Sequence, residues 1–316
     1  MEDILHIVLP AFLLIGLGYL FARVGYLGES VGDALADFVF KVAVPVLLMK
    51  SIATAEFSGA NPWTFVLVYF LSIGAVWVLA ILIIRLIFKR GSRAAVIAGV
   101  AAGFSNLVLL GIPLVERAYG QEGLQILLFL ISVHLPGMMA ISTFLMEHAV
   151  RSDGIEKGKI QLTTIARNLG RNLMVNPIVI GIFAGLLWRL TGIGIGGIAA
   201  QVMDLLAKTT GPLALVSLGM SLIKFGIRGN LFAAVSLAAL SLLAMPAVVY
   251  VLATTLFALP PLWFKVALLG ASCPTGVNAY LIANYFKNAE GLASSTIVLA
   301  LLGSLVTIPL WLSLAG

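Results

Sequence analysis

Ten long apolar stretches constrain the fold of this chain more than any other feature. Each is about 20 residues or longer, the length that an α-helix needs to cross the hydrocarbon core of a bilayer. Of the 316 residues, 61% are hydrophobic and only 10% are charged, whereas about a quarter of the residues in soluble domains are charged. The sequence therefore predicts an all-α polytopic membrane protein with ten transmembrane helices, at residues 4–22, 31–50, 63–88, 94–118, 123–149, 172–190, 197–223, 230–258, 262–286 and 291–314.

The two halves of the chain resemble each other at a spacing of 167 residues. Each half holds five spans, and because five is an odd number, the second half enters the membrane from the opposite side. We therefore predict two inverted five-helix repeats, at residues 1–150 and 172–316, joined by a cytoplasmic linker at 151–171. The equivalent residues include Pro10 and Pro177, Gly18 and Gly185, Asp37 and Asp204, Lys41 and Lys208, and Pro45 and Pro212.

Lys and Arg residues near the span ends predict the orientation, because cytoplasmic loops of membrane proteins are enriched in basic residues. With the N-terminus outside, 13 basic residues lie on the cytoplasmic side and four on the outer side. We therefore expect a multi-pass protein of the inner (plasma) membrane with both termini extracytoplasmic. The four outer residues are Lys50, Arg117, Arg189 and Lys265.

Two of the apolar stretches contain residues that interrupt a helix. They are residues 103–113 in the fourth span and 270–278 in the ninth. Because proline has no N–H group, we expect Pro113 and Pro274 each to release the carbonyl group four residues earlier. Interrupted apolar helices at corresponding places in the two halves of a chain are the best sequence pointer to the binding site of a secondary transporter.

The broken helices predict an anion site that needs no full cation. The N-terminal end of a half-helix carries unsatisfied N–H groups and about half a positive charge, and two such ends can hold a carboxylate. The alternative is that the prolines are ordinary kinks and that Asn106 and Asn278 join helices by hydrogen bonds. The predicted substrate-binding residues are Ser105, Asn106, Pro113, Cys273, Pro274, Thr275, Gly276 and Asn278.

The residues around the first interruption resemble the fourth-helix signature of the auxin efflux carrier family. They are Asn106, the Gly-Ile-Pro-Leu run at 111–114 and the Tyr-Gly pair at 119–120. Residues 42–45 and 212–219 are similar to the second- and seventh-helix patterns of that family. The family includes plant auxin carriers and bacterial carriers of malate or malonate. This chain looks like a bacterial-type member, because it has a short gap where many plant members have a long cytoplasmic loop.

The resemblance implies more than the residues themselves predict. It implies a ten-helix fold in which helices four and nine are broken and cross near the bilayer midplane. It also implies a scaffold of helices 1, 2, 6 and 7 and a transport domain of helices 3–5 and 8–10. Elevator-type alternating access and a homodimer formed through the scaffold follow from the same resemblance.

Charged and titratable side chains inside apolar spans are costly and by default suggest function. The Asp37–Lys41 and Asp204–Lys208 pairs have i,i+4 spacing, so each pair can neutralise itself on one helix face. We interpret them as scaffold charge pairs, with proton coupling as the alternative. His134 is a candidate for coupling or substrate contact, and the alternative is a histidine that only packs helices together.

The sequence thus predicts a secondary transporter for a small organic carboxylate, either auxin-like or a dicarboxylate such as malate or malonate. No metal-ligand cluster or phosphate-binding loop is visible, so we expect no enzyme, cofactor or metal. Most basic residues sit in the gaps between spans, which argues against a nucleic-acid partner. A sodium-coupled organic-anion symporter of the bile-acid-transporter type is the main alternative, and a channel or membrane receptor is another. The substrate, the direction of transport and the coupling ion stay open.

Overall fold

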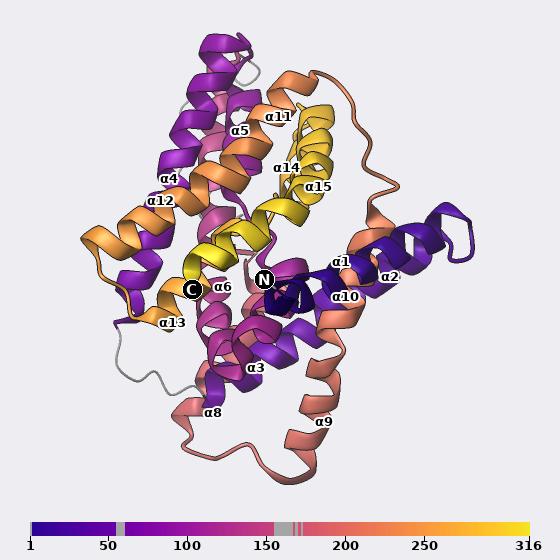
Figure 1. Ribbon diagram of the computed structural model, residues 1–316, viewed down its shortest axis with the longest axis vertical. Helices are drawn as coiled ribbons and strands as arrows, with labels where there is room; N and C mark the ends of the chain where they lie inside the picture. The colour runs from indigo at the N-terminus through magenta and orange to yellow at the C-terminus, as the bar shows by residue number, and fades with distance from the viewer. Residues whose placement is uncertain (1, 55–60, 155–166, 168–169, 172) are drawn as a thin grey trace. The chain divides into compact units, whose positions relative to one another are not determined.

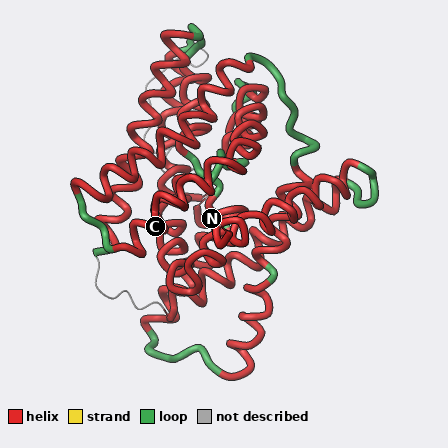
Figure 2. Tube along the Cα trace, in the orientation of Figure 1, coloured by secondary structure: helices red, strands yellow, loops and turns green. Residues whose placement is uncertain are grey.

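The computed structural model describes residues 2–54, 61–154, 167, 170–171 and 173–316, so most of the predicted linker at 151–171 lies outside the described residues. Figure 2 shows helices joined by loops, with no strand in this part of the chain. The α-helices are α1 Glu2–Arg23, α2 Glu29–Phe38, α3 Val44–Thr54, α4 Pro62–Leu82, α5 Ser92–Gly103, α6 Ile112–Ser152, α8 Pro177–Leu190, α9 Gly197–Lys208, α10 Thr210–Ser221, α11 Leu231–Ala239, α12 Met245–Val251, α13 Pro261–Ser272, α14 Asn278–Tyr285 and α15 Glu290–Ala315. Short π-helical segments adjoin several of them: η1 Val39–Ala43, η2 Ile83–Ile87, η3 Leu107–Gly111, η4 Leu240–Ala244 and η5 Leu252–Leu256.

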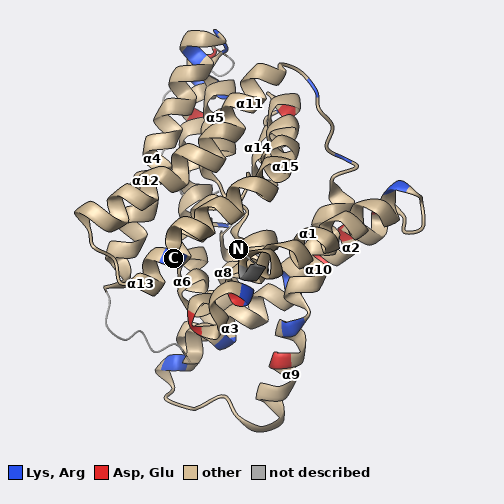
Figure 3. Cartoon of the chain, viewed as in Figure 1, with Lys and Arg blue, Asp and Glu red and all other residues tan. Residues whose placement is uncertain are grey.

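Several of these helices suit a membrane, as the composition predicts. Figure 3 shows α4 and α12 without a charged residue. A nearly all-helical fold with helices of membrane-spanning length is therefore confirmed, whereas the ten-span inverted repeat stays a prediction. Among the described residues, five stretches are long and apolar enough to cross a bilayer, and three shorter helices are also apolar. The five are Ile4–Arg23, Pro62–Ile87, Leu107–Ser152, Leu231–Leu256 and Glu290–Ala315, and the three are Ser92–Gly103, Pro177–Leu190 and Pro261–Ser272.

The stretch Leu107–Ser152 has 46 residues, about twice what one crossing needs. A kink at Gly120 divides it, because the backbone there is not helical, with φ 63° and ψ −158°. Glycine adopts such angles easily since it has no Cβ atom. The kink lies between the predicted fourth and fifth spans, and it allows one helical stretch to contribute to both.

The chain divides into two compact units. Unit 1 comprises Met1–Ala60, Leu107–Val133 and Arg171–Lys224, and unit 2 comprises Asn61–Asn106, His134–Gly170 and Phe225–Gly316. Helices α1–α3 and α8–α10 thus belong to unit 1, and α4, α5 and α11–α15 to unit 2. Helix α6 passes from unit 1 into unit 2 after Val133.

Glycines bring two helix pairs of unit 1 into close contact. Helix α1 lies along α10, and α8 lies along α3 (Figure 1). A Cβ atom on Gly18 of α1 would lie 2.2 Å from the carbonyl oxygen of Val216, and one on Gly185 of α8 would lie 2.7 Å from that of Met49. Gly18 and Gly185 are 167 positions apart, and so are Met49 and Val216. The two contacts therefore join residues at equivalent positions of the two predicted repeats.

In unit 2, a carboxylate beyond the end of α6 caps the start of α5. The preceding Gly91 offers no side chain for capping. Asp153 instead accepts hydrogen bonds from the N–H of Ser92 at 2.9 Å, the N–H of Arg93 at 3.3 Å and the Nε of Arg93 at 3.1 Å. Burial raises the pKa of Asp153, but the bonds from Ser92 and Arg93 outweigh burial and hold the pKa below its ordinary 3.8. The ionised carboxylate therefore stabilises this helix end.

Candidate functional site

The fourth predicted span is interrupted by three residues, 104–106. Helix α5 ends at Gly103, where the N–H of Phe104 still donates to Val100, and η3 begins at Leu107. The interruption is buried, with Ser105 3% and Asn106 7% exposed. Non-helical backbone at such a depth needs hydrogen-bond partners from elsewhere in the protein.

The ninth predicted span is interrupted at residues 273–277, between the end of α13 and the start of α14. Cys273 is extended, with φ −63° and ψ 139°, and its buried Sγ lies 3.5 Å from the carbonyl oxygen of Leu269. Pro274 and Thr275 are buried as well. Both interruptions therefore belong to the interior of the protein.

The backbones of the two interruptions pair with each other within unit 2. The N–H of Asn106 donates to the carbonyl oxygen of Pro274 at 2.8 Å, and the N–H of Gly276 donates to that of Phe104, also at 2.8 Å. Each interruption thus satisfies backbone groups that the other exposes.

The pairing forms an isolated antiparallel bridge between Ser105 and Thr275. The Thr275 hydroxyl donates to the carbonyl oxygen of Ala101 at 2.7 Å, which ties the second interruption to the last turn of α5. A Cβ atom on Gly276 would lie only 3.0 Å from the carbonyl oxygen of Phe104. A residue without a side chain therefore suits this close backbone approach.

The prolines do not break the helices in the way that the sequence predicts. Pro113 lies seven positions after Asn106, inside the continuous helical stretch Leu107–Ser152, so the helix continues through this proline. Pro274 does lie in an interruption, but the carbonyl of Gly270 is not released, because it accepts the N–H of Cys273 at 3.3 Å. Backbone pairing between the two segments, rather than a missing proline N–H, accounts for the break at 104–106.

The start of α14 carries unsatisfied donors. Val277 precedes this helix and supplies no side-chain cap. The backbone N–H groups of Val277 and Asn278 donate no hydrogen bond to any described residue. Asn278 is half-buried, and its side-chain amide makes no hydrogen bond with a described residue. Free N–H groups at a helix N-terminus are suited to bind an anion.

His134 packs among aromatic rings next to the first interruption. Its ring centroid lies 5.0 Å from that of Phe104, 5.6 Å from Tyr69 and 6.2 Å from Phe70, all in edge-on geometry. His134 is 2% exposed, and its Nε2 atom has no hydrogen-bond partner among the residues that the structure describes. His134 therefore contacts the first interruption through Phe104, and this position is compatible with both a coupling role and a packing role.

Two residues near the site were not predicted from the sequence. Tyr69 is fully buried beside Ser105 and Cys273, and its hydroxyl makes no hydrogen bond within the described part of the chain. Met245 of α12 receives a weak hydrogen bond from the Ser105 hydroxyl, at 3.6 Å between Oγ and Sδ. A tyrosine within an apolar span is a sequence feature from which Tyr69 could have been predicted as a site residue. A single methionine in an apolar run gives no such signal.

Of the two predicted charge pairs, one is present and the other is not. Lys41 and Asp37 form an exposed ion pair with 2.6 Å between Nζ and Oδ2. Asp204 instead pairs with Lys50 of α3. Lys208 forms no ion pair with a described residue, so the predicted Asp204–Lys208 pair is wrong. A tertiary contact between α3 and α9 has replaced the local i,i+4 contact.

Within the described ranges, no three His, Cys, Asp or Glu side chains are grouped to hold a metal ion. The described arrangement is instead a buried backbone crossing with neutral hydroxyl, thiol and amide groups around it. Neither 104–106 nor 273–278 contains an acidic or a basic side chain.

Comparison with known proteins gives one consistent result. Residues 3–312 match the family model described as "Membrane transport protein". A "Putative malonate transporter" from Rhizobium meliloti is 26% identical over 98% of this chain and 94% of its own length. An "Uncharacterized transporter" from Methanothermobacter thermautotrophicus is 28% identical over 96% of each chain.

Proposed function

Because this chain belongs to the membrane transport protein family, we propose that it is a secondary transporter that moves a small organic carboxylate across the membrane. The membership confirms the resemblance to auxin efflux carriers seen around residues 106–120. The observation that carries the proposal is the paired backbone of the two interruptions, 104–106 and 273–277, in the interior of unit 2. Secondary transporters bind their substrates at interrupted helices of this kind.

The chemistry around the crossing favours an anion of low charge. The free N–H groups of Val277 and Asn278 and the side-chain amide of Asn278 are donors, and helix α14 adds the positive end of its dipole. No carboxylate within the two interruptions repels an anion. The hydroxyls of Ser105 and Thr275 are engaged with Met245 and Ala101, so we assign them mainly to shaping the site.

Among organic carboxylates, a short dicarboxylate is the first to test. The Rhizobium meliloti relative is named for malonate, and the alignment covers nearly all of both chains. Malonate and malate represent the dicarboxylates, and indole-3-acetate represents the auxin-like acids.

The division into two compact units supports an elevator mechanism, in which one body carries the substrate past another. We propose that unit 1 is the scaffold and that unit 2 moves with the substrate. The family resemblance assigns helices four and five wholly to the moving body, whereas residues 107–133 group with unit 1. Spin labels at exposed Leu190 in unit 1 and Leu256 in unit 2 should change their separation when substrate binds, while label pairs within one unit should not.

We further propose a homodimer formed through unit 1. Helix α9 buries none of its residues within the chain. Ile198, Val202 and Leu205 are 79%, 50% and 67% exposed and have the spacing of one helix face. Light scattering of the purified protein should give about twice the chain mass of 33.4 kDa, and Leu205→Arg should give the mass of one chain. A wild-type mass of one chain would contradict the dimer.

Uptake into proteoliposomes tests the proposed function. We expect saturable uptake of labelled malonate, malate or indole-3-acetate, with competition from the unlabelled acid. Accumulation above the outside concentration under an imposed proton gradient would distinguish a coupled carrier from a channel. If uptake requires sodium when choline is the control cation, the symporter alternative holds instead. If none of the three acids enters, the organic carboxylate assignment is wrong.

A further inference from the structure

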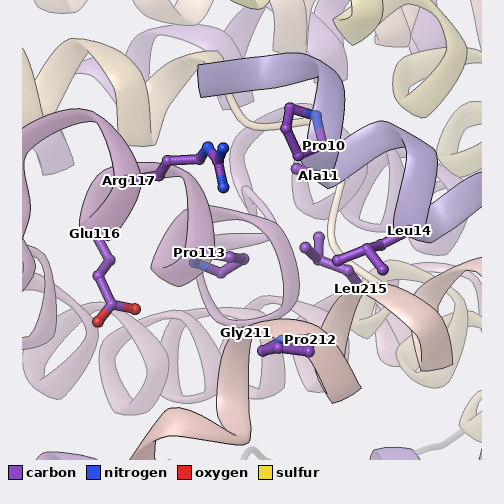
Figure 4. Close-up of a pocket in the computed structure, with 9 residues that line it drawn as sticks. All are labelled: Pro10, Ala11, Leu14, Pro113, Glu116, Arg117, Gly211, Pro212 and Leu215. Carbon is purple, nitrogen blue, oxygen red and sulfur yellow. The ribbon is translucent and has the colours of Figure 1, made fainter. Parts of the chain in front are cut away.

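A cavity of about 300 Å³ lies within unit 1, and no residue of the two interruptions lines it. Helix α1, the beginning of α6 and the beginning of α10 form its walls (Figure 4). The volume is at the lower end of the range for small-molecule sites. Pro113, one of the predicted substrate-binding residues, lines this cavity.

The walls of the cavity are mostly apolar, and Glu116 and Arg117 add one charged side chain of each sign. Pro10, Pro113 and Pro212 contribute their rings, and Leu14 and Leu215 add aliphatic surface. Proline rings carry no N–H donor, and their fixed φ angles prevent the wall from adapting. Such a surface fits a compact apolar group better than a hydrated one.

One cation stands at the edge of this apolar surface. Arg117 donates from Nε to the carbonyl oxygen of His6 at 2.8 Å, which anchors the guanidinium. Its terminal N–H groups make no ion pair or hydrogen bond with a described residue. In Figure 4 the Arg117 side chain extends toward Pro10, whereas the Glu116 side chain extends away from Arg117. The Glu116 carboxylate accepts a hydrogen bond from Gln121 at 3.0 Å instead of pairing with Arg117.

We propose that this cavity binds an organic anion with one carboxylate and a compact apolar body. The carboxylate accepts two hydrogen bonds from the terminal N–H groups of Arg117, since a guanidinium matches a carboxylate in a bidentate manner. The apolar body lies against Pro10, Pro113 and Pro212. This site is distinct from the paired interruptions, whose donors are neutral, and it selects for the apolar part of a ligand.

The photoreactive aryl carboxylate 4-benzoylbenzoate tests this site on the purified full-length protein in nanodiscs. We expect it to label the peptides that contain residues 10–14, 113–117 or 211–215, and phenylacetate to compete. Arg117→Gln should reduce labelling at least about tenfold, the loss expected for hydrogen bonds to a charged group. Leu14→Trp, which fills the cavity and keeps Arg117, should reduce it similarly. Arg189→Gln is the matched control, because Arg189 also donates to a backbone carbonyl in unit 1 but does not line the cavity.

The outcomes separate the proposal from its alternatives. Labelling of these peptides that is lost in Arg117→Gln and Leu14→Trp but kept in Arg189→Gln supports the site. Labelling that persists in both cavity variants, or that maps elsewhere, overturns it. If phosphatidylglycerol nanodiscs suppress labelling relative to phosphatidylcholine nanodiscs while phenylacetate does not compete, the cavity holds a lipid headgroup and the proposal is overturned.

Discussion

The N–H of Asn106 donates a 2.8 Å hydrogen bond to the carbonyl oxygen of Pro274, 168 positions later in the chain. This bond joins the two places where apolar helices stop. Hydrocarbon offers no partner for an exposed backbone group, so two interruptions in an apolar interior are stable only if they satisfy each other. The same arrangement leaves the N-terminal end of α14 free to bind a ligand.

Because two glycines of unit 1 lie against backbone carbonyl groups, we predict that adding a single methyl group at either position lowers the stability of the protein. Gly18→Ala and Gly185→Ala should each destabilise the protein by about 1–3 kcal/mol, because the new Cβ would overlap a backbone carbonyl that cannot move away easily. Gly16→Ala on the same helix meets no atom within 4 Å and should be neutral or stabilising. Thermal unfolding in one detergent measures all three. Equal stability of Gly16→Ala and Gly18→Ala would argue against close packing of α1 on α10.

We predict that Asp153 makes the free energy of unfolding of unit 2 depend on pH. Its pKa in the folded protein lies below the ordinary value of 3.8, so its contribution is complete above pH 3.8 and is lost as the pH falls through the folded pKa. Asp153→Asn should therefore cost about 0.5–2 kcal/mol at neutral pH. The difference between the variant and the wild type should shrink below pH 3.8. A difference that stays constant down to pH 2 would show that the charge of Asp153 is unimportant.

Because Lys50 and Asp204 form an ion pair, we predict that mutations at these two residues have coupled effects on stability. A double-mutant cycle with Lys50→Met and Asp204→Asn should give a coupling free energy of about 0.2–1 kcal/mol. The value is small because both side chains are partly exposed, at 27% and 47%. The corresponding cycle with Lys208→Met and Asp204→Asn should give no measurable coupling. The reverse result would restore the local pair predicted from the i,i+4 spacing.

Thiol labelling tests the predicted orientation in the membrane. Cysteines placed at Asp3 and Gly316 should react with an impermeant reagent added from outside, and one at Gly158 should not. The single native cysteine, Cys273, is buried and should give little background. Reaction at Gly158 alone would reverse the orientation, and reaction at only one terminus would require an odd number of spans.

Much of the fold was predictable because it depends on local composition. The apolar runs identify the helices, and glycines and prolines mark where two of them are interrupted. Gly103 is the last residue of α5, and Pro274 lies inside the second interruption. The 167-residue spacing also predicted that Gly18 and Gly185 are equivalent, and they make equivalent contacts.

The parts that were missed depend on contacts between distant segments. Nothing in the residues near Pro113 shows that the break lies at 104–106, because backbone pairing with 274–276 sets its position. The spacing of Asp204 and Lys208 predicted a local pair, but α3 brings Lys50 closer. Tyr69 and Arg117 likewise acquire their surroundings only when separate helices pack together.

Calorimetric measurement of ligand binding to Asn278→Ala shows whether the start of α14 binds the transported carboxylate. The ligand is the acid with the strongest uptake among the three tested in proteoliposomes. Asn284→Ala is the control, because Asn284 is also half-buried and lies near the other end of the same helix. We predict at least about tenfold weaker binding for Asn278→Ala and unchanged binding for Asn284→Ala. Wild-type affinity in a correctly folded Asn278→Ala protein would mean that the substrate binds elsewhere.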